Sequence, residues 1–176
     1  MALGAWKQSV VDRLTGGVEA MAARRHVEVM HGQAVLTGPH TLQVADRSIS
    51  FAHAVIAAGS RAATLPSLPD DERIVDSTGA LALARIPKRM LVIGAGIIGL
   101  EMATVYDALG ARVTVVEMLD QLLPGCDRDL TEPLRKRISP RYEAIHLQTE
   151  VVSVKAQKSG LKVAFSSGQE DAFDLI

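Results

Sequence analysis

One glycine-rich run near the middle of the chain has residue types and spacing that suit phosphate binding. It follows the apolar segment 90–93 and has the pattern G-x-G-x-x-G, as Gly94-Ala95-Gly96-Ile97-Ile98-Gly99. Gly94 permits a tight turn out of a strand, Gly96 lets a pyrophosphate approach the backbone, and Gly99 lets a following helix pack closely on the sheet. The start of that helix, around Ile97 and Ile98, offers free N–H groups and the positive end of a dipole. The run is therefore expected to hold a dinucleotide without a basic side chain.

An acidic residue follows at the distance where such a site recognises a ribose. Glu117 ends a second predicted strand, 112–116, and lies 23 positions after Gly94; an acid about 20 residues beyond the glycines binds ribose hydroxyls. A carboxylate there favours NAD and repels the additional phosphate of NADP, and residues 118–120 include no Arg or Lys to receive that phosphate. We therefore predict NAD rather than NADP.

The predicted elements place both features on one strand–helix–strand unit. The helix, about 98–109, has apolar residues at helical spacing and ends at Gly110, where a left-handed cap is expected. Period and turn signals predict further elements, namely a helix at 6–23, an antiparallel meander at 27–36, 41–44 and 48–51, a buried strand at 54–57, helices at 77–84 and 127–138, and strands at 144–147, 151–155, 161–165 and 173–176. A proline-punctuated stretch between Arg61 and Pro87 is the expected domain boundary.

Composition excludes several classes of function. The chain is 48% hydrophobic and 22% charged, with a formal net charge of −1, which is typical of a soluble globular protein and does not favour a nucleic-acid partner. Its longest apolar stretch, about 91–100, is shorter than the roughly 20 residues of a membrane span, so no membrane partner is expected. The N-terminus does not resemble a signal peptide, and a cytoplasmic location is expected.

Cysteine and histidine usage argues against thiol and metal chemistry. Cys126 is the only cysteine, so an internal disulfide and a CxxC pair are both impossible within this sequence. It has no histidine nearby in the sequence to activate it, which does not suit a nucleophile. The five histidines lack metal-ligand spacing, and no metal site is expected.

Several segments, in this order along the chain, resemble the flavin-dependent pyridine-nucleotide disulfide oxidoreductases, and most of all the dihydrolipoamide dehydrogenases among them. They are residues 14–18, 31–34, 55–60, 75–81, 86–88, 93–101 and 116–117. Glutathione and mercuric reductases share this plan but bind NADPH through basic residues after the second strand, where this sequence has Glu117. The resemblance implies an α/β fold with a Rossmann-like parallel sheet and antiparallel β additions, preceded by a helix and a β meander. It assigns residues 1–85 to a partial FAD-binding domain and 86–176 to an incomplete NAD-binding domain.

The resemblance also implies roles for individual residues. Gly94, Ala95, Gly96, Ile97, Ile98 and Gly99 would hold the NAD pyrophosphate, Glu117 the adenosine ribose, and Val151 the edge of the adenine. Glu101 would lie where nicotinamide meets flavin, paired with a lysine on the flavin side. Ala34 would lie against the FAD adenine, and Ala58, Gly59 and Ser60 would close on that cofactor. Ala58 stands where the family usually has threonine, which weakens any hydroxyl contact there.

Parts of the family plan are expected to lie outside this sequence, namely the first G-x-G-x-x-G, the redox cysteine pair with its lysine, the second flavin segment and the catalytic His and Glu. Hydride passes from NADH through flavin to a disulfide, so turnover is not expected of this chain alone and no catalytic residue is assigned. FAD, the family's cofactor, is not expected to be retained. The expected function is an NAD(H)-binding piece of a dihydrolipoamide dehydrogenase-like flavoprotein.

Alternative readings remain open at this point. They are a stand-alone NAD-binding module, one half of a split flavin-dependent NADH oxidoreductase, and a related flavin reductase that works without thiols. The predicted strand 54–57 would also leave an open edge, so the chain is expected to self-associate, with a domain-swapped dimer as one form.

Overall fold

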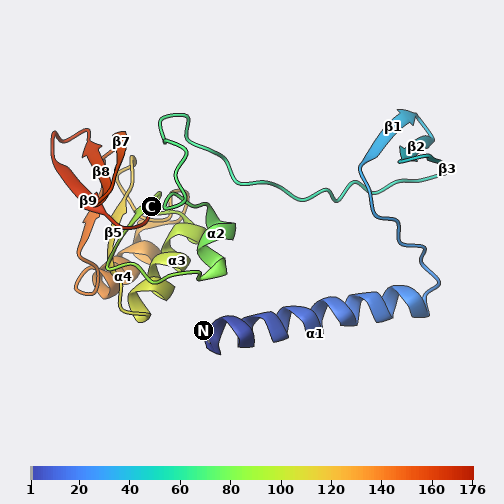
Figure 1. Ribbon diagram of the computed structural model, residues 1–176, viewed down its shortest axis with the longest axis horizontal. Helices are drawn as coiled ribbons and strands as arrows, with labels where there is room; N and C mark the ends of the chain where they lie inside the picture. The colour runs from blue at the N-terminus through green and yellow to red at the C-terminus, as the bar shows by residue number, and fades with distance from the viewer. Residues whose placement is uncertain (1) are drawn as a thin grey trace. The chain divides into compact units, whose positions relative to one another are not determined.

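A computed structural model describes residues 2–176, which divide along the chain, between Arg61 and Ala62, into two compact units (Figure 1). The first unit contains one helix and three strands, and the second contains the other helices and strands. The units are described separately below. The assignment of residues 1–85 and 86–176 to flavin and NAD domains remains a prediction.

The first unit has a long helix and a small antiparallel sheet. The helix α1 spans Ala2–Arg24, and the sheet has the order β1-β2-β3, with β1 at Ala34–Gly38, β2 at Thr41–Val44 and β3 at Arg47–Ser50. Leu42 of β2 pairs with Leu36 on one side and Ile49 on the other. Val44 is the only buried residue among those described in this unit. The unit therefore has almost no core of its own.

Two of the strand predictions in this unit were wrong. Residues 27–33 are irregular, and only the end of the predicted segment 27–36 belongs to β1. Residues 54–57, predicted as a buried strand, have no regular structure, and Val55 and Ile56 are 92% and 80% exposed. A short apolar run becomes a strand only where a neighbouring strand accepts its hydrogen bonds, and within the described residues none pairs with this one.

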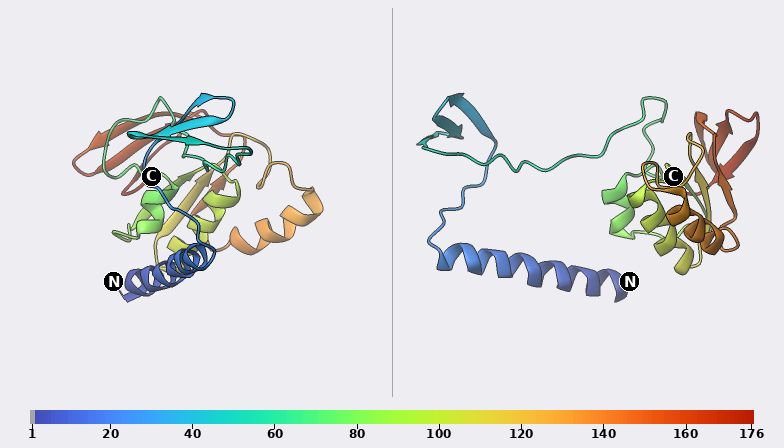
Figure 2. Two further views of the ribbon diagram at one scale, coloured as in Figure 1. Left: turned by 90° about the vertical axis from the view of Figure 1, so that its right-hand side faces the viewer. Right: turned by 180° about the vertical axis from the view of Figure 1, so that it is seen from behind.

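The second unit, which Figure 2 shows from two further sides, is built on a parallel sheet of order β4-β5-β6. An antiparallel sheet of order β7-β8-β9 follows it in the chain, and three helices complete the unit. The strands are β4 Arg89–Ile93, β5 Arg112–Val116, β6 Ala144–His146, β7 Val151–Gln157, β8 Gly160–Phe165 and β9 Glu170–Phe173; the helices are α2 Ser77–Ala82, α3 Ile97–Ala108 and α4 Arg128–Ile138. The predicted helices and strands of this unit are confirmed to within a few residues, except that β9 ends where the predicted strand 173–176 begins.

Alternate residues of β4 and β5 pack into two different cores. Met90 and Val92 belong to a core shared with residues of α2, α3 and α4, whereas Leu91 packs with the apolar side chains of β7, β8 and β9. In β5, Val115 enters the first core and Val116 the second. Both faces of the parallel sheet are therefore covered, one by helices and the other by the antiparallel sheet, which explains why β4 reads as a continuous apolar run.

The last residues of the chain lie beside β4. The Leu91 N–H donates to the carbonyl of Leu175 (3.0 Å), the Asp174 N–H donates to that of Arg89 (3.0 Å), and Met90 forms a parallel bridge with Leu175. The segment 174–176 thus extends the parallel sheet at its β4 edge.

The Arg89 side chain joins β4 to two other parts of the second unit. Its guanidinium binds both carboxylate oxygens of Asp171 (2.6 and 2.7 Å), donates to Glu143 ahead of β6 (2.8 Å), and lies over the Phe173 ring, 4.9 Å from its centre. We call these four residues the Arg89 cluster. The hydrogen bonds from Arg89 lower the pKa of Asp171, while the carboxylates raise that of Arg89. Charge-assisted bidentate pairs of this kind are among the stronger polar contacts in proteins.

Replacing Arg89 by methionine tests the cluster. Arg89→Met leaves the partly buried Asp171 without its cation and Glu143 with only the more distant Arg112 (3.6 Å), so the free energy of unfolding at neutral pH should fall by about 1–3 kcal/mol. Because the pKa of Asp171 is lowered in the fold, the pair stabilises the protein above the ordinary Asp pKa, and this contribution is lost as the pH falls through the lowered value. Urea unfolding at neutral and acidic pH measures both effects, and the variant should show the smaller loss of stability on acidification.

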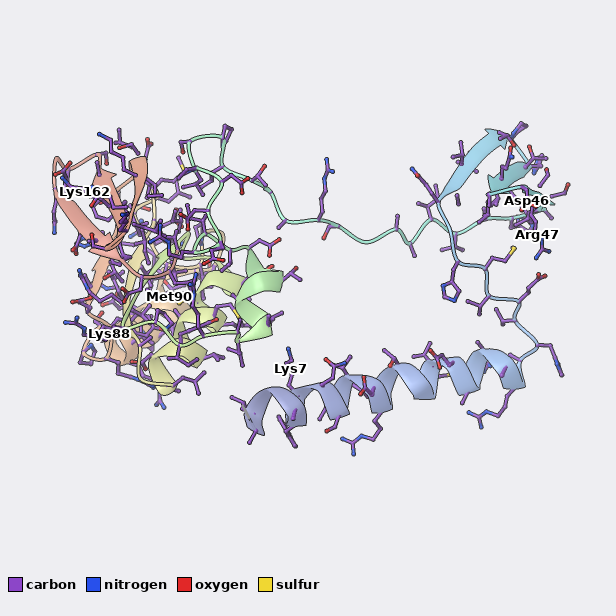
Figure 3. All side chains as sticks on the ribbon, in the orientation of Figure 1. Lys7, Asp46, Arg47, Lys88, Met90 and Lys162 are labelled. Atoms are coloured by element: carbon purple, nitrogen blue, oxygen red, sulfur yellow. The ribbon has the colours of Figure 1, made fainter. Side chains whose placement is uncertain are left out.

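Lys162→Met is the matched control for that variant. Lys162, labelled in Figure 3, lies on the middle strand β8 and also pairs with an acid of β9, Glu170 (2.6 Å), but the two side chains are 42% and 55% exposed. Exposed pairs contribute little to stability, so the control should unfold like the wild type. Equal stability of Arg89→Met and wild type at neutral pH would refute the role given to the cluster.

Candidate functional site

The glycine turn, residues 94–99, leads from β4 directly into α3. Gly94 has φ +99°, a conformation that favours glycine, and its N–H donates to the Val116 carbonyl of β5 (2.8 Å). Gly96 is the N-cap of α3 and provides no side chain to bind the first N–H groups of the helix. The first helical bond runs from the Leu100 N–H to the Gly96 carbonyl (3.0 Å), so the N–H groups of residues 97–99 have no acceptor within the helix. An anion at this end of α3 would provide one.

Gly96 and Gly99 are required for different reasons. A Cβ on Gly99 would lie 2.2 Å from the Gly94 carbonyl oxygen and 3.2 Å from Cγ1 of Val92, so the fold itself needs glycine there. A Cβ on Gly96 would have no atom within 4 Å. The fold therefore leaves open space over Gly96, and a ligand that approaches the backbone would use it. These positions fit a pyrophosphate group.

Glu117 lies beside the glycine turn and is held there by backbone donors. Its side chain follows β5, the residue is 7% exposed, and its two carboxylate oxygens accept from the N–H groups of Ala95 (2.8 Å) and Leu119 (2.9 Å). A carboxylate has about four lone-pair positions, so each oxygen can accept a further hydrogen bond. Glu117, which is predicted to bind ribose, thus lies against the glycine turn that is predicted to bind phosphate. The two hydrogen bonds already fix the orientation of its carboxylate.

The loop after Glu117 also holds the glycine turn, through a contact that the sequence analysis did not predict. The Leu123 N–H donates to the Ala95 carbonyl (2.9 Å), and Leu122, which is 1% exposed, is packed into the first core. Ala95 is fully buried, with its N–H bound to Glu117 and its carbonyl to Leu123. The sequence does carry a signal for this contact, the apolar pair Leu122-Leu123 within a polar loop, but the sequence analysis did not use it.

A basic side chain does reach the segment 118–120, although none lies within it. Arg128 at the start of α4 pairs with Asp120. Both residues line an open cleft of about 450 Å³, together with others of α4 and the loop before it, and Leu147. A second cleft of about 230 Å³ adjoins α2 and Tyr106. Neither cleft is lined by the glycine turn.

The two remaining residues predicted to contact NAD lie on different elements. Val151 begins β7 and packs against the second core, as does Ile93, the residue just before the turn. Its segment is joined to the acid, since the Thr149 N–H donates to the Glu117 carbonyl (2.9 Å). Glu101 lies one helical turn into α3 and is exposed. The glycine turn, Glu117 and Val151 are therefore close together. Glu101 projects from α3, the helix that follows the turn.

The residues predicted to contact FAD lie in the first unit. Ala34 is the exposed first residue of β1, and Ala58, Gly59 and Ser60 lie in the exposed irregular segment before Ala62. Gly59 has φ +70°. All four positions are exposed, and their contact with a flavin remains a prediction. Cys126 is a free, exposed cysteine, no group of side chains in residues 2–176 could hold a metal ion, and no described helix is long and apolar enough to cross a membrane.

Comparison with known proteins gives the class. Residues 2–176 match the family model described as pyridine nucleotide-disulphide oxidoreductase, and the chain belongs to that family. It is similar to the dihydrolipoyl dehydrogenase of Vibrio cholerae, with 42% identity over 180 residues. That match covers 97% of this chain but 38% of the Vibrio protein, so the chain spans little more than a third of the length of this relative.

Solved structures of related flavoproteins share the fold. The Cu(II) complex of the HOCl-induced flavoprotein disulfide reductase RclA from Escherichia coli matches with a TM-score of 0.85 and 25% identity, over 98% of this chain and 40% of that one. The water-forming NADH oxidase from Lactobacillus brevis, solved bound to NADH, matches with a TM-score of 0.68 and 26% identity, over 81% of this chain and 35% of that one. The mixed α/β fold predicted from the sequence is thereby confirmed.

Alanine substitutions separate the two glycine roles. Gly99→Ala places a Cβ against backbone that cannot move without separating α3 from β4, so the free energy of unfolding should fall by about 2 kcal/mol or more. Gly96→Ala, with open space and an ordinary negative φ of −73°, should stay within about 0.5 kcal/mol of wild type. Thermal and urea unfolding of both variants tests this, and equal stabilities would mean that the close approach of helix and turn is not required.

Proposed function

We propose that this chain binds NAD(H) at the glycine turn, as part of a dihydrolipoamide dehydrogenase-like flavoprotein. The observation that carries the proposal is the open space over Gly96, next to unbonded N–H groups at the start of α3 and a pre-oriented Glu117. The family membership and the NADH-bound structure of a related oxidase support it.

In the proposed complex the pyrophosphate accepts hydrogen bonds from the backbone of the turn, chiefly the N–H groups of Ile97 and Ile98. The positive end of the α3 dipole adds to this attraction, and no basic side chain is needed. Ala95 keeps the turn in shape because both of its backbone polar groups are already bound.

Glu117 gives the site its preference for NAD. Each carboxylate oxygen uses one position for a backbone N–H and offers another to a ribose hydroxyl. The additional phosphate of NADP would approach a nearly buried carboxylate, and the nearby Arg128 is engaged by Asp120. Val151 borders the adenine in this proposal, and Glu101 lies toward the nicotinamide and the flavin side.

The chain contributes binding and orientation rather than a complete reaction. In the whole flavoprotein FAD would supply hydride chemistry when bound, with Ala34, Ala58, Gly59 and Ser60 on its side of the site. A redox dithiol cannot form within a sequence that has one cysteine. The proposal therefore assigns NAD(H) binding, and no dithiol step, to the residues of this sequence.

One observation favours a partner for the first unit over a stand-alone NAD-binding module. The described part of the first unit buries only Val44 and exposes large apolar residues on α1 and in the segment 54–57. Such a unit gains stability by covering these surfaces. We therefore also propose that the chain self-associates, and the half of a split flavoenzyme remains the alternative for the same surfaces.

Calorimetric titration of the full chain with NAD and, in parallel, NADP tests the nucleotide proposal. NAD should bind saturably and NADP at least tenfold more weakly. Gly96→Ala should weaken NAD binding by tenfold or more without lowering the unfolding temperature, because its Cβ fills only the space meant for the ligand.

Gly16→Ala is the matched control for the titration. It makes the same chemical change at a position on α1 where a Cβ also meets no atom within 4 Å, so NAD affinity should not change. Absence of NAD binding by the folded wild-type chain would refute the proposal, and equal affinities for NAD and NADP would refute the role of Glu117.

A further inference from the structure

The leucine that holds the glycine turn has a backbone conformation that leucine rarely adopts. Leu123 has φ +49°. A side chain on Cβ disfavours this left-handed region. Leu123 also precedes Pro124, and a residue before proline normally has an extended backbone with φ of about −120°. The conformation is therefore strained, and the contacts around it must maintain it.

Three contacts fix the backbone around Leu123. The residue before it, Leu122, is 1% exposed and packed into the first core. The Leu123 carbonyl accepts from the Cys126 N–H (3.0 Å), and the Cys126 carbonyl accepts from the side-chain amide of Gln121 (2.9 Å). The loop between Glu117 and α4 is thus closed by its own hydrogen bonds. Relaxation of Leu123 to an extended backbone would break this arrangement.

The strained conformation presents the Leu123 N–H to the glycine turn. This N–H donates to the carbonyl of Ala95 (2.9 Å), which is fully buried, so that carbonyl needs a donor from within the protein. The N–H of Ala95 is already bound by Glu117. Ala95 directly precedes Gly96, over which the pyrophosphate is proposed to bind. Leu123 therefore fixes the backbone immediately before the phosphate position.

We propose that Leu123 is a positioning residue for the nucleotide site, whose strained backbone keeps the glycine turn in the shape that binds pyrophosphate. The proposal rests on the NAD(H) binding proposed above. It adds to that site a residue outside the glycine pattern and the ribose acid. Leu123 acts through Ala95, and no contact between Leu123 and the nucleotide is part of the proposal.

Packing is the alternative role of this leucine, because its side chain is partly buried against the first core. Two substitutions separate the roles. Leu123→Ile keeps the apolar volume, but branching at Cβ makes a positive φ still less favourable. Leu123→Asn loses the apolar contact, but asparagine adopts the left-handed region more readily than other residues with a side chain. Positioning and packing therefore predict opposite orders of effect.

Hydrogen exchange of the Ala95 amide in the nucleotide-free chain tests the positioning directly, because amide exchange reports local opening. Leu123→Ile should speed this exchange by about threefold or more, because the strained backbone then opens more often. Leu123→Asn should leave the exchange rate close to that of the wild type. The reverse order would mean that packing holds the turn, and it would refute the proposal.

Calorimetric titration with NAD tests the consequence for binding. Leu123→Ile should weaken NAD binding by about threefold or more, because only the fraction of molecules with an ordered turn binds. Leu123→Asn should rescue the affinity to near the wild-type value, although its lost apolar contact lowers the unfolding temperature. A merely structural role would make affinity follow stability.

Leu83→Ile and Leu83→Asn are the matched controls. Leu83 has φ +53° and is also partly buried against the first core. Its N–H donates to the Ala80 carbonyl at the end of α2 (3.2 Å) and not to the glycine turn. The same two substitutions at this position should change neither the exchange of the Ala95 amide nor the affinity for NAD.

The outcomes separate this proposal from the proposed function. If the folded wild-type chain does not bind NAD, the proposed function fails, and the exchange experiment still decides whether Leu123 holds the turn. If NAD binds and Leu123→Ile changes neither exchange nor affinity, the role of Leu123 alone is refuted. Faster exchange with unchanged affinity also refutes it, because the contact would then shape the turn without serving the nucleotide.

Discussion

The parallel strands β4 and β5 are buried on both faces, and the rest of the second unit depends on this. A strand covered on both sides needs apolar residues at successive positions, and β4 provides Met90, Leu91 and Val92. One face requires α3, which fixes where the glycine turn must lie. The other requires the antiparallel sheet, which Arg89 joins to β4 through contacts some 80 residues apart in sequence. Binding geometry and stability therefore come from the same few strand residues.

This arrangement explains why an anion site can form without basic side chains. The carboxyl ends of β4 and β5 meet at one edge of the sheet, so the turn after the first strand lies beside the acid after the second. Glu117 then has two roles. It accepts a hydrogen bond from the Ala95 N–H, and each of its oxygens can accept a further hydrogen bond. The Leu123 contact holds the same residue from the opposite side. In the proposed complex, little of this site would remain to be ordered when the nucleotide binds.

Sequence analysis succeeded where local pattern and tertiary packing agree. The β4–α3–β5 unit, Gly110 with its φ of +96° at the end of α3, and the position of Glu117 all followed from spacing. It failed at 54–57, where an apolar run exists but no strand pairs with it, and at 27–33, where β propensity alone did not produce a strand. The Leu123 contact and the Asp120–Arg128 pair were also missed, because they join positions whose proximity depends on how a loop folds back.

The exposed segment 52–61 has a consequence for the life of this polypeptide in a cell. It is irregular, without a buried residue, and carries Val55 and Ile56 almost fully in contact with water. Extended backbone with exposed branched aliphatic side chains is what proteases thread into their active sites and what Hsp70-type chaperones hold. Quality control would therefore act on this stretch first. Cleavage there would separate the chain close to the boundary of its two units and release the second unit with its own core intact.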